Sequence, residues 1–585
     1  MYSYPLQLPI DAFHWTLAIV PLVLLLILLV GLQWQAPEAG PIGMFVAAGI
    51  ALVAFQTPWE GLAIATAKGI WDAIFILYVV WPALLLYHVI KRGGGFVALE
   101  EGIQRFSDND LFLVLAFGWV FASFLQGIAG FGTPIAVVAP LLLVIGVRPI
   151  YAVAIPLIGH AWANMFGTLA VAWLATLQVI PLEPLLATTV ETAILLWIPS
   201  LLAGVAIAWL FGRAQAVWYA MPLILVIAAI HGGVQLGLMF WDPILSAFLA
   251  STVALLALYP LSRLERYDQP LEGLENRPAM KTDGVGTNAD GPGHNSPETD
   301  DDTTATANDA KNADEETEAV EDEAEEKTDL EPAMSFTMSL LPYIVLTVVA
   351  IGVLVIGPLE AFLEQLELGP PFPETETGYG LETEAEDAYN PFAPLTHPGT
   401  FLFVSVFAGW AVYRARGYYG EWADRKDDVE DIWDGLADDA VPASLAIIAF
   451  LVMAQVMDHA GQIEVLAFGL AGALPPTVYA FASGWIGFTG AFMTSSNTSS
   501  NILLAPLQQQ AVEAMEGLSE SSIIAGQSAG GAVGNAIAPA NVVLGTGAAG
   551  IVGQEGDVLR ITIPVMVLLG LLTVVLNGLA LLGGG

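Results

Sequence analysis

The chain contains no cysteine, and only 17 of its 585 residues are lysine or arginine. Without cysteine the protein has no disulfide, no thiolate nucleophile and no cysteine-ligated metal, and the sequence carries no sign of the redox compartment. The 58 aspartates and glutamates give a formal charge of -41, which makes nucleic acid an unfavourable partner. Charged residues of both signs make up only 13% of the chain, against about 25% in an average soluble domain. So little charge indicates that much of the surface does not face water.

Apolar sequence takes the place of charge. Hydrophobic residues make up 56% of the chain, and the mean hydropathy is +0.66. Apolar runs recur from end to end, each near the length of about 20 residues that a helix needs to cross a bilayer. They occupy residues 13–33, 41–57, 70–90, 150–178, 188–211, 217–235, 241–261, 335–357, 399–416, 440–457, 519–545 and 558–582. The first run has no basic start and no small-residue cleavage site, so we expect a membrane span rather than a signal peptide.

Three polar segments carry most of the negative charge. Residues 265–331 hold 22 acidic against 5 basic residues, residues 358–395 hold 9 against 0, and residues 417–439 hold 9 against 2. Carboxylate surfaces retain water and ions, so this pattern indicates a proteome adapted to high salt; an acidic tail particular to this protein is the alternative. Residues 265–333 have almost no aromatic side chains to bury, and we expect them to form a disordered linker.

Two sets of motifs occur in the same order on the two sides of that linker. In the first half, GFGTPIAVVAPLL (130–142) precedes GHAWANMFG (159–167). In the second half, TGAFMTSSNTSSNILLAPL (489–507) precedes GQSAGGAVG (526–534) at nearly the same spacing. The order indicates an internal duplication, with chance similarity as the alternative.

Basic residues predict the orientation, because loops rich in lysine and arginine stay in the cytoplasm. If Arg105 and Arg148 both lie on the cytoplasmic side, residues 108–147 enter and leave by one face as a re-entrant hairpin. The same count makes residues 476–515 a second hairpin, entering from outside. The two halves are then inverted repeats, an architecture of many secondary transporters.

The run TSSNTSSN (494–501) is unusually polar for an apolar neighbourhood. An unpaired hydroxyl or amide there costs roughly 2–7 kcal/mol, so the run should line a cavity or bind protein groups. Helix ends at the two hairpin tips offer free N–H groups and positive dipole ends, which favour a small anion. Close helix packing through small residues is the alternative explanation. The candidate substrate-binding residues come from the tips and from the motifs that follow them: Gly130, Gly132, Thr133, His160, Asn164, Ser495, Ser496, Asn497, Thr498, Gln527, Ser528 and Asn535.

At these residues the chain resembles the L-lactate permease family, whose members carry lactate and glycolate with protons. The similar stretches are GFGTPIAVVAPLL, AIPLIGHAWANMFGTLA, FTGAFMTSSNTSSNILLAPLQ and GQSAGGAVGNAIAPANVVLGTGAAGIVGQEGDVLR. The triplet Ser496-Asn497-Thr498 is also similar to the hairpin-tip motif of the broader ion-transporter superfamily, where such tips hold carboxylate substrates. The resemblance implies a secondary active transporter of small monocarboxylates, most of all L-lactate and also glycolate, in symport with protons by alternating access. The acidic segments 265–331 and 358–395 depart from the family pattern.

Ionisable residues in the spans are candidates for coupling. His160 lies in a span that we expect to be broken, and an imidazole titrates near pH 6.5, which suits a proton carrier; a satisfied core histidine is the alternative. Arg148 is expected to anchor the topology. Other ionisable residues lie near span ends, where we expect exposure at the lipid headgroups: Asp72, Glu191, Asp242, Asp458, His14, His88, His231 and His459.

The sequence thus predicts an all-α polytopic membrane protein with about twelve transmembrane helices, two inverted repeats and two re-entrant hairpins. The expected parts are a first membrane half (1–264), a disordered cytoplasmic linker (265–333) and a second half (334–585) with an extracellular insertion (358–395). We expect multi-pass insertion into the plasma membrane, no cofactor and no metal, and leave a homodimer open.

Three other function classes are weighed against proton symport. A membrane enzyme is disfavoured because we find no HExxH helix, no GxSxG elbow and no GxxxxGK[ST] phosphate loop. An anion channel should rest on a ring of filter residues. A sodium-coupled transporter of organic anions remains an alternative, since the sequence does not identify the coupling ion.

Overall fold

The computed structural model describes residues 8–32, 34–105, 107–130, 132–271, 277–281, 334–423, 431–515 and 517–583. The described chain is mostly helical, as expected where apolar runs must satisfy every backbone group without water. Its two short strands, β1 (Thr375–Glu376) and β2 (Glu382–Thr383), pair antiparallel within the acidic insertion.

Helices run from the N-terminus almost without interruption to the expected linker. They are α1 (Ala12–Leu26), η1 (Ile27–Gly31), α2 (Ala36–Val53), α3 (Trp59–Arg92), α4 (Gly95–Gln104), α5 (Asp110–Leu115), η2 (Ala116–Phe121), α6 (Ala122–Ile128), α7 (Thr133–Val144), α8 (Pro149–His160), η3 (Ala161–Asn164), α9 (Gly167–Val179), α10 (Leu185–Leu238), α11 (Ser246–Ser262) and α12 (Glu265–Asp268).

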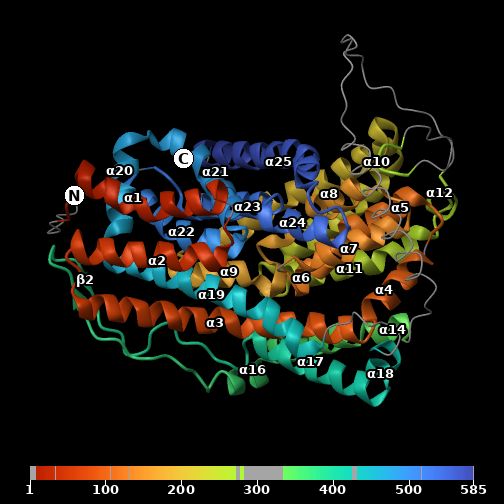
Figure 1. Ribbon diagram of the computed structural model, residues 1–585, viewed down its shortest axis with the longest axis horizontal. Coiled ribbons are helices and arrows are strands. Elements are labelled where there is room, and N and C mark those ends of the chain that lie inside the picture. The colour runs from red at the N-terminus through yellow and green to blue at the C-terminus, as the bar shows by residue number, and fades with distance from the viewer. Residues whose placement is uncertain are drawn as a thin grey trace, which may run out of the picture.

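The second half has the same character. Its helices are α14 (Phe336–Ser339), α15 (Leu341–Val355), α16 (Gly357–Leu363), α17 (Pro398–Ala415), α18 (Tyr418–Ala423), α19 (Ile432–His459), α20 (Gln462–Ala473), α21 (Pro476–Thr494), α22 (Asn497–Ala514), α23 (Glu520–Asn535), α24 (Pro539–Ala548) and α25 (Glu555–Gly583). Figure 1 shows that most of the long helices lie roughly along the longest axis of the molecule.

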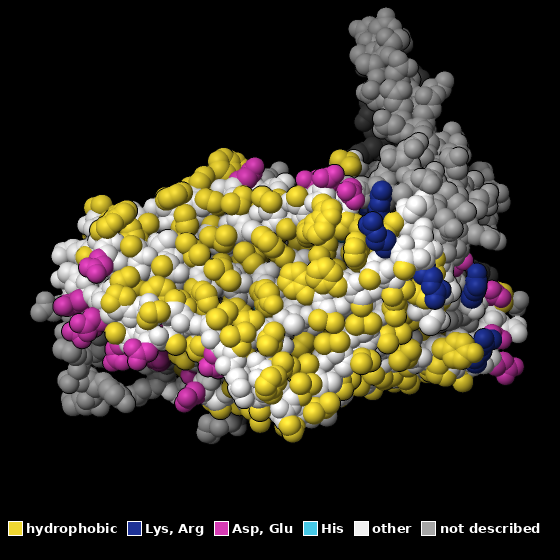
Figure 2. All heavy atoms as spheres, turned by 90° about the horizontal axis from the view of Figure 1, so that it is seen from below, with side chains coloured by type: hydrophobic (Ala, Val, Ile, Leu, Met, Phe, Trp, Pro, Cys, Tyr) yellow, Lys and Arg dark blue, Asp and Glu magenta, His cyan; other side chains and the backbone are white. Residues whose placement is uncertain are grey.

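Among the described residues, seven helical segments are long and apolar enough to cross a bilayer, or up to nine if two bent helix pairs count as one span each. The exposed surface agrees with this, because large apolar side chains such as Phe45 and Trp218 are 70% and 74% exposed. Figure 2 shows a face covered with hydrophobic side chains, with Lys and Arg at one end only. A mostly helical, multi-pass membrane protein is therefore confirmed. The number of about twelve spans, the repeats and the re-entrance of the hairpins stay predictions.

Two antiparallel arms make up α10. Its helix is broken at Gly212 and Arg213, where the backbone leaves helical geometry. The two arms then pack side by side, since Ser200 on the first lies 3.3 Å from His231 on the second. This break separates the two apolar runs that the sequence places at 188–211 and 217–235.

Part of the expected linker lies against the first half. The Arg277 guanidinium donates to Asp110 Oδ2 at 2.7 Å, and backbone hydrogen bonds join residues 277–281 to residues 146–148. The expectation of disorder for the remainder of 265–333 falls mostly outside the described residues.

The acidic insertion forms a cap that is hydrogen-bonded to α3. Tyr389 Oη and Asn390 Nδ2 donate to the two oxygens of Asp72 at 2.8 and 2.9 Å. Gln455 Nε2, from α19, donates to the same carboxylate at 2.9 Å. One turn earlier on α3, Lys68 Nζ contacts Glu386 at 2.8 Å. These bonds join the insertion to two of the long apolar helices.

The expected exposure of span-end residues is wrong for four of them, which are buried: Asp72, His88, His231 and His459. Each has at least one polar partner, although Nε2 of His231 and Nε2 of His459 have none among the described residues. Asp72 receives three donors from the cap and α19, and the His231 ring stacks on Trp162 with centroids 4.6 Å apart. Sequence position alone could not reveal these partners.

Candidate functional site

Two helical hairpin tips meet at one cavity. In the second hairpin, α21 ends at Thr494 and α22 begins at Asn497, with Ser495 in the left-handed region at φ 54°. In the first, Gly132 precedes α7 at φ 85°, and a Cβ there would lie 2.1 Å from Leu544 of α24. Glycine at this position therefore satisfies both the backbone and the close packing.

Two broken helices complete the walls. The segments α8–η3 and α9 are bent by 49° relative to each other. Beyond the bend, Thr168, Leu169 and Ala170 all have positive φ, a geometry that costs roughly 1–2 kcal/mol per residue and must be held by packing. In the second half, α23 ends at Asn535 and α24 restarts at Pro539, whose ring suits a helix start.

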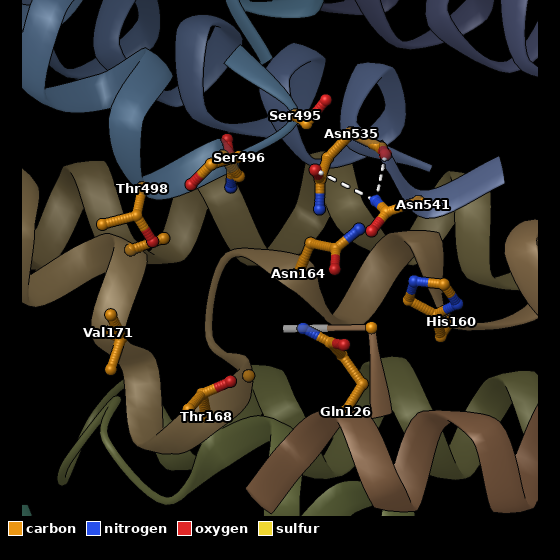
Figure 3. A pocket seen from close by; sticks show the side chains of 14 residues that line it. Gln126, His160, Asn164, Thr168, Val171, Ser495, Ser496, Thr498, Asn535 and Asn541 are labelled. Atoms are coloured by element: carbon orange, nitrogen blue, oxygen red, sulfur yellow. Dashed lines mark hydrogen bonds between the residues drawn. The ribbon is translucent and has the colours of Figure 1, made fainter. Parts of the chain in front are cut away.

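The cavity contains about 520 Å³ of empty space, its opening included. Its walls come from α6, α7, α8, η3, α9 and the segments around the second tip, and they are mostly polar. The lining residues are Gln126, Gly132, His160, Asn164, Gly167, Thr168, Val171, Ala172, Ser495, Ser496, Asn497, Thr498, Asn535 and Asn541. Figure 3 shows Gln126, His160 and Asn164 directed toward a common space, with Ser496 and Thr498 on another side.

None of the described residues that line the cavity is a lysine, arginine, aspartate or glutamate. Positive potential comes instead from helix N-termini. The 18-residue helix α22 starts in the wall at Asn497, and the 12-residue helix α7 starts beside Gly132. Ser496 Oγ caps α22 by accepting from the Ser499 N–H at 3.1 Å. The N–H groups that precede Ser499 at the start of α22 have no partner in the helix itself and can donate to an anion. In α7 the first N–H groups are already used, because those of Thr133 and Ile135 donate to the carbonyls of Gly130 and Gly132 and Pro134 has none, so this helix contributes its dipole.

His160 presents one ring nitrogen to this space. Its Nδ1 lies 2.5 Å from the carbonyl oxygen of Pro156. Because a carbonyl only accepts, Nδ1 carries the hydrogen and Nε2 of the neutral ring is left with a lone pair. The ring is almost fully buried, so Nε2 can exchange a proton only with groups or water in the cavity.

Asparagines dominate the remaining polar contacts. Asn164 Nδ2 donates to the Ala532 carbonyl at 3.0 Å, and Asn541 Nδ2 donates to the Asn535 carbonyl at 2.7 Å. The Asn497 amide nitrogen lies 3.4 Å from Met165 Sδ, a weak acceptor. The side-chain oxygens of Asn164 and Asn497 are buried and have no protein partner.

The structure brings most of the sequence candidates together. Eight of them line the cavity: Gly132, His160, Asn164, Ser495, Ser496, Asn497, Thr498 and Asn535. The run TSSNTSSN is divided, since Ser500 and Asn501 instead pack inward, where Ser500 Oγ donates to the Gly487 carbonyl at 3.1 Å.

Four candidates lie outside the cavity wall. Gly130 is directly behind it, with its N–H donating to Thr168 Oγ1 at 2.8 Å, and Thr133 is buried in the first turn of α7. Gln527 of α23 faces α22, where its side-chain oxygen accepts a hydrogen bond from Gln508 at 3.0 Å. Ser528 is buried with no partner for its hydroxyl. Although residues 526–530 read GxSxG, they lie within helix α23 and not at the strand-to-helix turn of a nucleophile elbow.

Sequence reasoning missed several lining residues, among them Gln126, Thr168 and Asn541. A signal was present for Gln126, which is an isolated amide in the apolar stretch from 111 to 130. For Asn541 the signal was a polar residue two positions after Pro539, within an apolar run. Among the described residues no group of three His, Asp or Glu side chains is arranged as a metal ion would need.

The sequence matches the L-lactate permease family over residues 15–273 and 395–582, which include every residue of the cavity wall. The chain belongs to this family. It is therefore a membrane transport protein and not an enzyme. The unmatched residues 274–394 contain most of the linker and the cap.

The similarity to known permeases extends over nearly the whole chain. The glycolate permease GlcA of Escherichia coli K12 is 23% identical, covering 93% of this chain and 92% of its own. The L-lactate permease of Halalkalibacterium halodurans is 24% identical, covering 95% and 94%. That of Bacillus subtilis 168 is 23% identical, covering 95% and 91%. Among solved structures, the YdaH transporter of Alcanivorax borkumensis is similar at 15% identity and a TM-score of 0.38, over 87% of this chain and 86% of that one.

Proposed function

We propose that this protein is a secondary active transporter of small monocarboxylates, foremost L-lactate and also glycolate, in symport with protons. The names of its relatives, L-lactate permease and glycolate permease, supply the substrate class. The observation that carries the proposal is the uncharged cavity into which two helix N-termini project. Such a site holds one negative charge through N–H groups and dipoles, and leaves the substrate free to depart.

Alternating access is supported by the way the cavity is built. Each half of the chain contributes one hairpin tip and one interrupted helix, α8–α9 in the first half and α23–α24 in the second, to the same space. Relative motion of two such halves opens a shared site to one side and then to the other. In this proposal the substrate site lies at the boundary between the two halves, which are the parts that move.

A proton is the coupling ion that the cavity favours. The lone pair of His160 Nε2 faces the space where the carboxylate would lie, and a proton there places a positive charge beside the anion. Substrate and proton then stabilise each other, which is the thermodynamic requirement for symport.

Uptake of radiolabelled L-lactate into proteoliposomes tests the proposal, with pH and sodium gradients imposed separately. We expect accumulation driven by an inward proton gradient and none driven by sodium alone. Accumulation driven only by a sodium gradient would show that sodium, and not the proton, is the coupling ion. Flux that neither saturates nor shows counterflow would indicate an anion channel.

A further inference from the structure

Among the described residues, two buried side-chain oxygens of the cavity wall, those of Asn164 and Asn497, have no protein group to satisfy them, and only the Asn164 amide is oriented by a backbone carbonyl. Asn164 Oδ1 is buried without a hydrogen-bond partner, while its Nδ2 donates to the Ala532 carbonyl at 3.0 Å. Turning the amide over would place Oδ1 against the Ala532 oxygen, two acceptors in contact, so the observed orientation is the favourable one. The hydrogen bond to the backbone of α23 therefore fixes the amide so that Oδ1 faces away from Ala532 and remains free to accept.

A carboxylate cannot serve as the missing partner. An ionised carboxylate only accepts, and so does the lone pair on Nε2 of neutral His160, which lines the same cavity. The first N–H groups of α22 supply donors for the carboxylate. A substrate that carries a hydrogen-bond donor beside its carboxylate would satisfy Asn164 Oδ1 as well as the donors at the start of α22.

We propose that Asn164 is a specificity-determining residue that accepts a hydrogen bond from the 2-hydroxyl group of the substrate. The inference rests on the proposed monocarboxylate transport and adds to it the residue that recognises the substrate hydroxyl. The ligand class is the 2-hydroxymonocarboxylates, as opposed to alkyl monocarboxylates of the same length.

The discrimination follows from what an unmade bond costs. A site built to bond a substrate hydroxyl rejects the analogue that lacks it, because a buried polar group is then left unpaired. One such bond corresponds to roughly a five- to hundred-fold difference in affinity. L-lactate and propionate differ only by this hydroxyl, and so do glycolate and acetate.

Counterflow in proteoliposomes measures the effect. Unlabelled L-lactate or propionate competes with labelled L-lactate, and the ratio of the two half-inhibitory concentrations is the readout. We expect propionate to be at least about ten-fold weaker with the wild-type protein. In Asn164→Leu the ratio should fall to within about two-fold, through weaker binding of L-lactate rather than tighter binding of propionate.

The ratio separates specificity from folding, since the amount of active protein cancels. Asn164→Ala provides a second variant if the leucine does not insert. Asn535→Leu is the matched control; this asparagine lines the same cavity, and its side-chain oxygen already accepts from Asn541. Both substrates should weaken together in the control, leaving the ratio as in the wild type.

Two results would overturn the inference while leaving monocarboxylate transport intact. One is equal competition by L-lactate and propionate in the wild-type protein. The other is a wild-type ratio retained in both Asn164 variants. If the wild-type protein carries no monocarboxylate at all, the proposed function fails and the inference fails with it.

Discussion

At the scale of single residues, one ring nitrogen of His160 is fixed by a hydrogen bond and the other is available to bind a proton. Its Nδ1 is committed to the Pro156 carbonyl, so only Nε2 can gain or lose a proton during transport. We expect His160→Ala to weaken uptake driven by a pH gradient while sparing exchange of substrate, because exchange needs no net proton movement. Paired measurement of gradient-driven uptake and counterflow in proteoliposomes checks this.

The control for His160 is His14→Ala, which changes a histidine in the first turn of α1, outside the cavity wall, whose side chain is 14% exposed and bonds Asp11 at 2.8 Å. It should leave both activities near the wild-type level. Equal loss of uptake and exchange in His160→Ala would instead assign the ring to packing or substrate binding.

Asn497 combines three features at the second tip: the first turn of α22, a place in the cavity wall and an unpartnered side-chain oxygen. Removing its amide in Asn497→Ala should lower substrate affinity about five- to hundred-fold, with the protein still inserted. Asn577→Ala is the matched control, a buried asparagine outside the cavity whose amide donates to the Ser522 carbonyl at 3.0 Å. Saturation curves for lactate uptake distinguish the two, and unchanged affinity in Asn497→Ala would remove this residue from the site.

At the scale of helices, close approach depends on missing side chains. A Cβ on Gly487 of α21 would lie 2.0 Å from the Gln527 carbonyl of α23, where the neighbour is backbone and cannot turn aside. Gly487→Ala should therefore destabilise the protein by about 1–3 kcal/mol. Gly472→Ala in α20 meets nothing within 4 Å and should be neutral or slightly stabilising. Thermal unfolding in detergent compares them; equal melting temperatures would show that α21 and α23 can separate at little cost.

The cap adds a second kind of interhelix bond. Burial and the Asp72 carboxylate both raise the pKa of the Tyr389 phenol, so it stays protonated and remains a donor to that carboxylate. Tyr389→Phe removes one donor from a buried charge and should cost about 1–3 kcal/mol. The control Tyr379→Phe removes a hydroxyl whose contact with His14 is 3.5 Å long and should cost little. Melting temperatures measured side by side test the difference, and a stable Tyr389→Phe would mean that water replaces the phenol.

At the scale of the whole molecule, the first hairpin decides the topology. Helix α7 has 12 residues, about 18 Å of helix, which is short for roughly 30 Å of hydrocarbon. The native chain has no cysteine, so single introduced cysteines report their side without background. We expect Asp108→Cys and Val144→Cys, both exposed at the hairpin ends, to react with an impermeant maleimide from the cytoplasmic face.

Glu367→Cys in the cap should react from the opposite face, as an extracellular insertion requires. Labelling of Asp108→Cys and Val144→Cys from different faces would mean that the segment crosses the membrane, and the inverted-repeat prediction would fail with it.

The class of the molecule could be predicted from the amino-acid sequence. Hydropathy and run length are local properties, so they predicted a helical membrane protein, and the family motifs predicted a permease before any contact was known. Eight lining residues were also predictable, because polar residues in an apolar run must find a cavity or a partner.

Whether a given polar residue faces the cavity or bonds a protein group becomes visible only in the packed helices. Ser496 and Ser500 look alike in sequence, yet the first lies in the cavity wall and the second donates to a backbone carbonyl. Asp72 looked like a headgroup residue, and donors from 317 and more positions away made its burial possible. Hydrogen-bond partners in a helical bundle come from other helices, and no spacing along one chain segment specifies them.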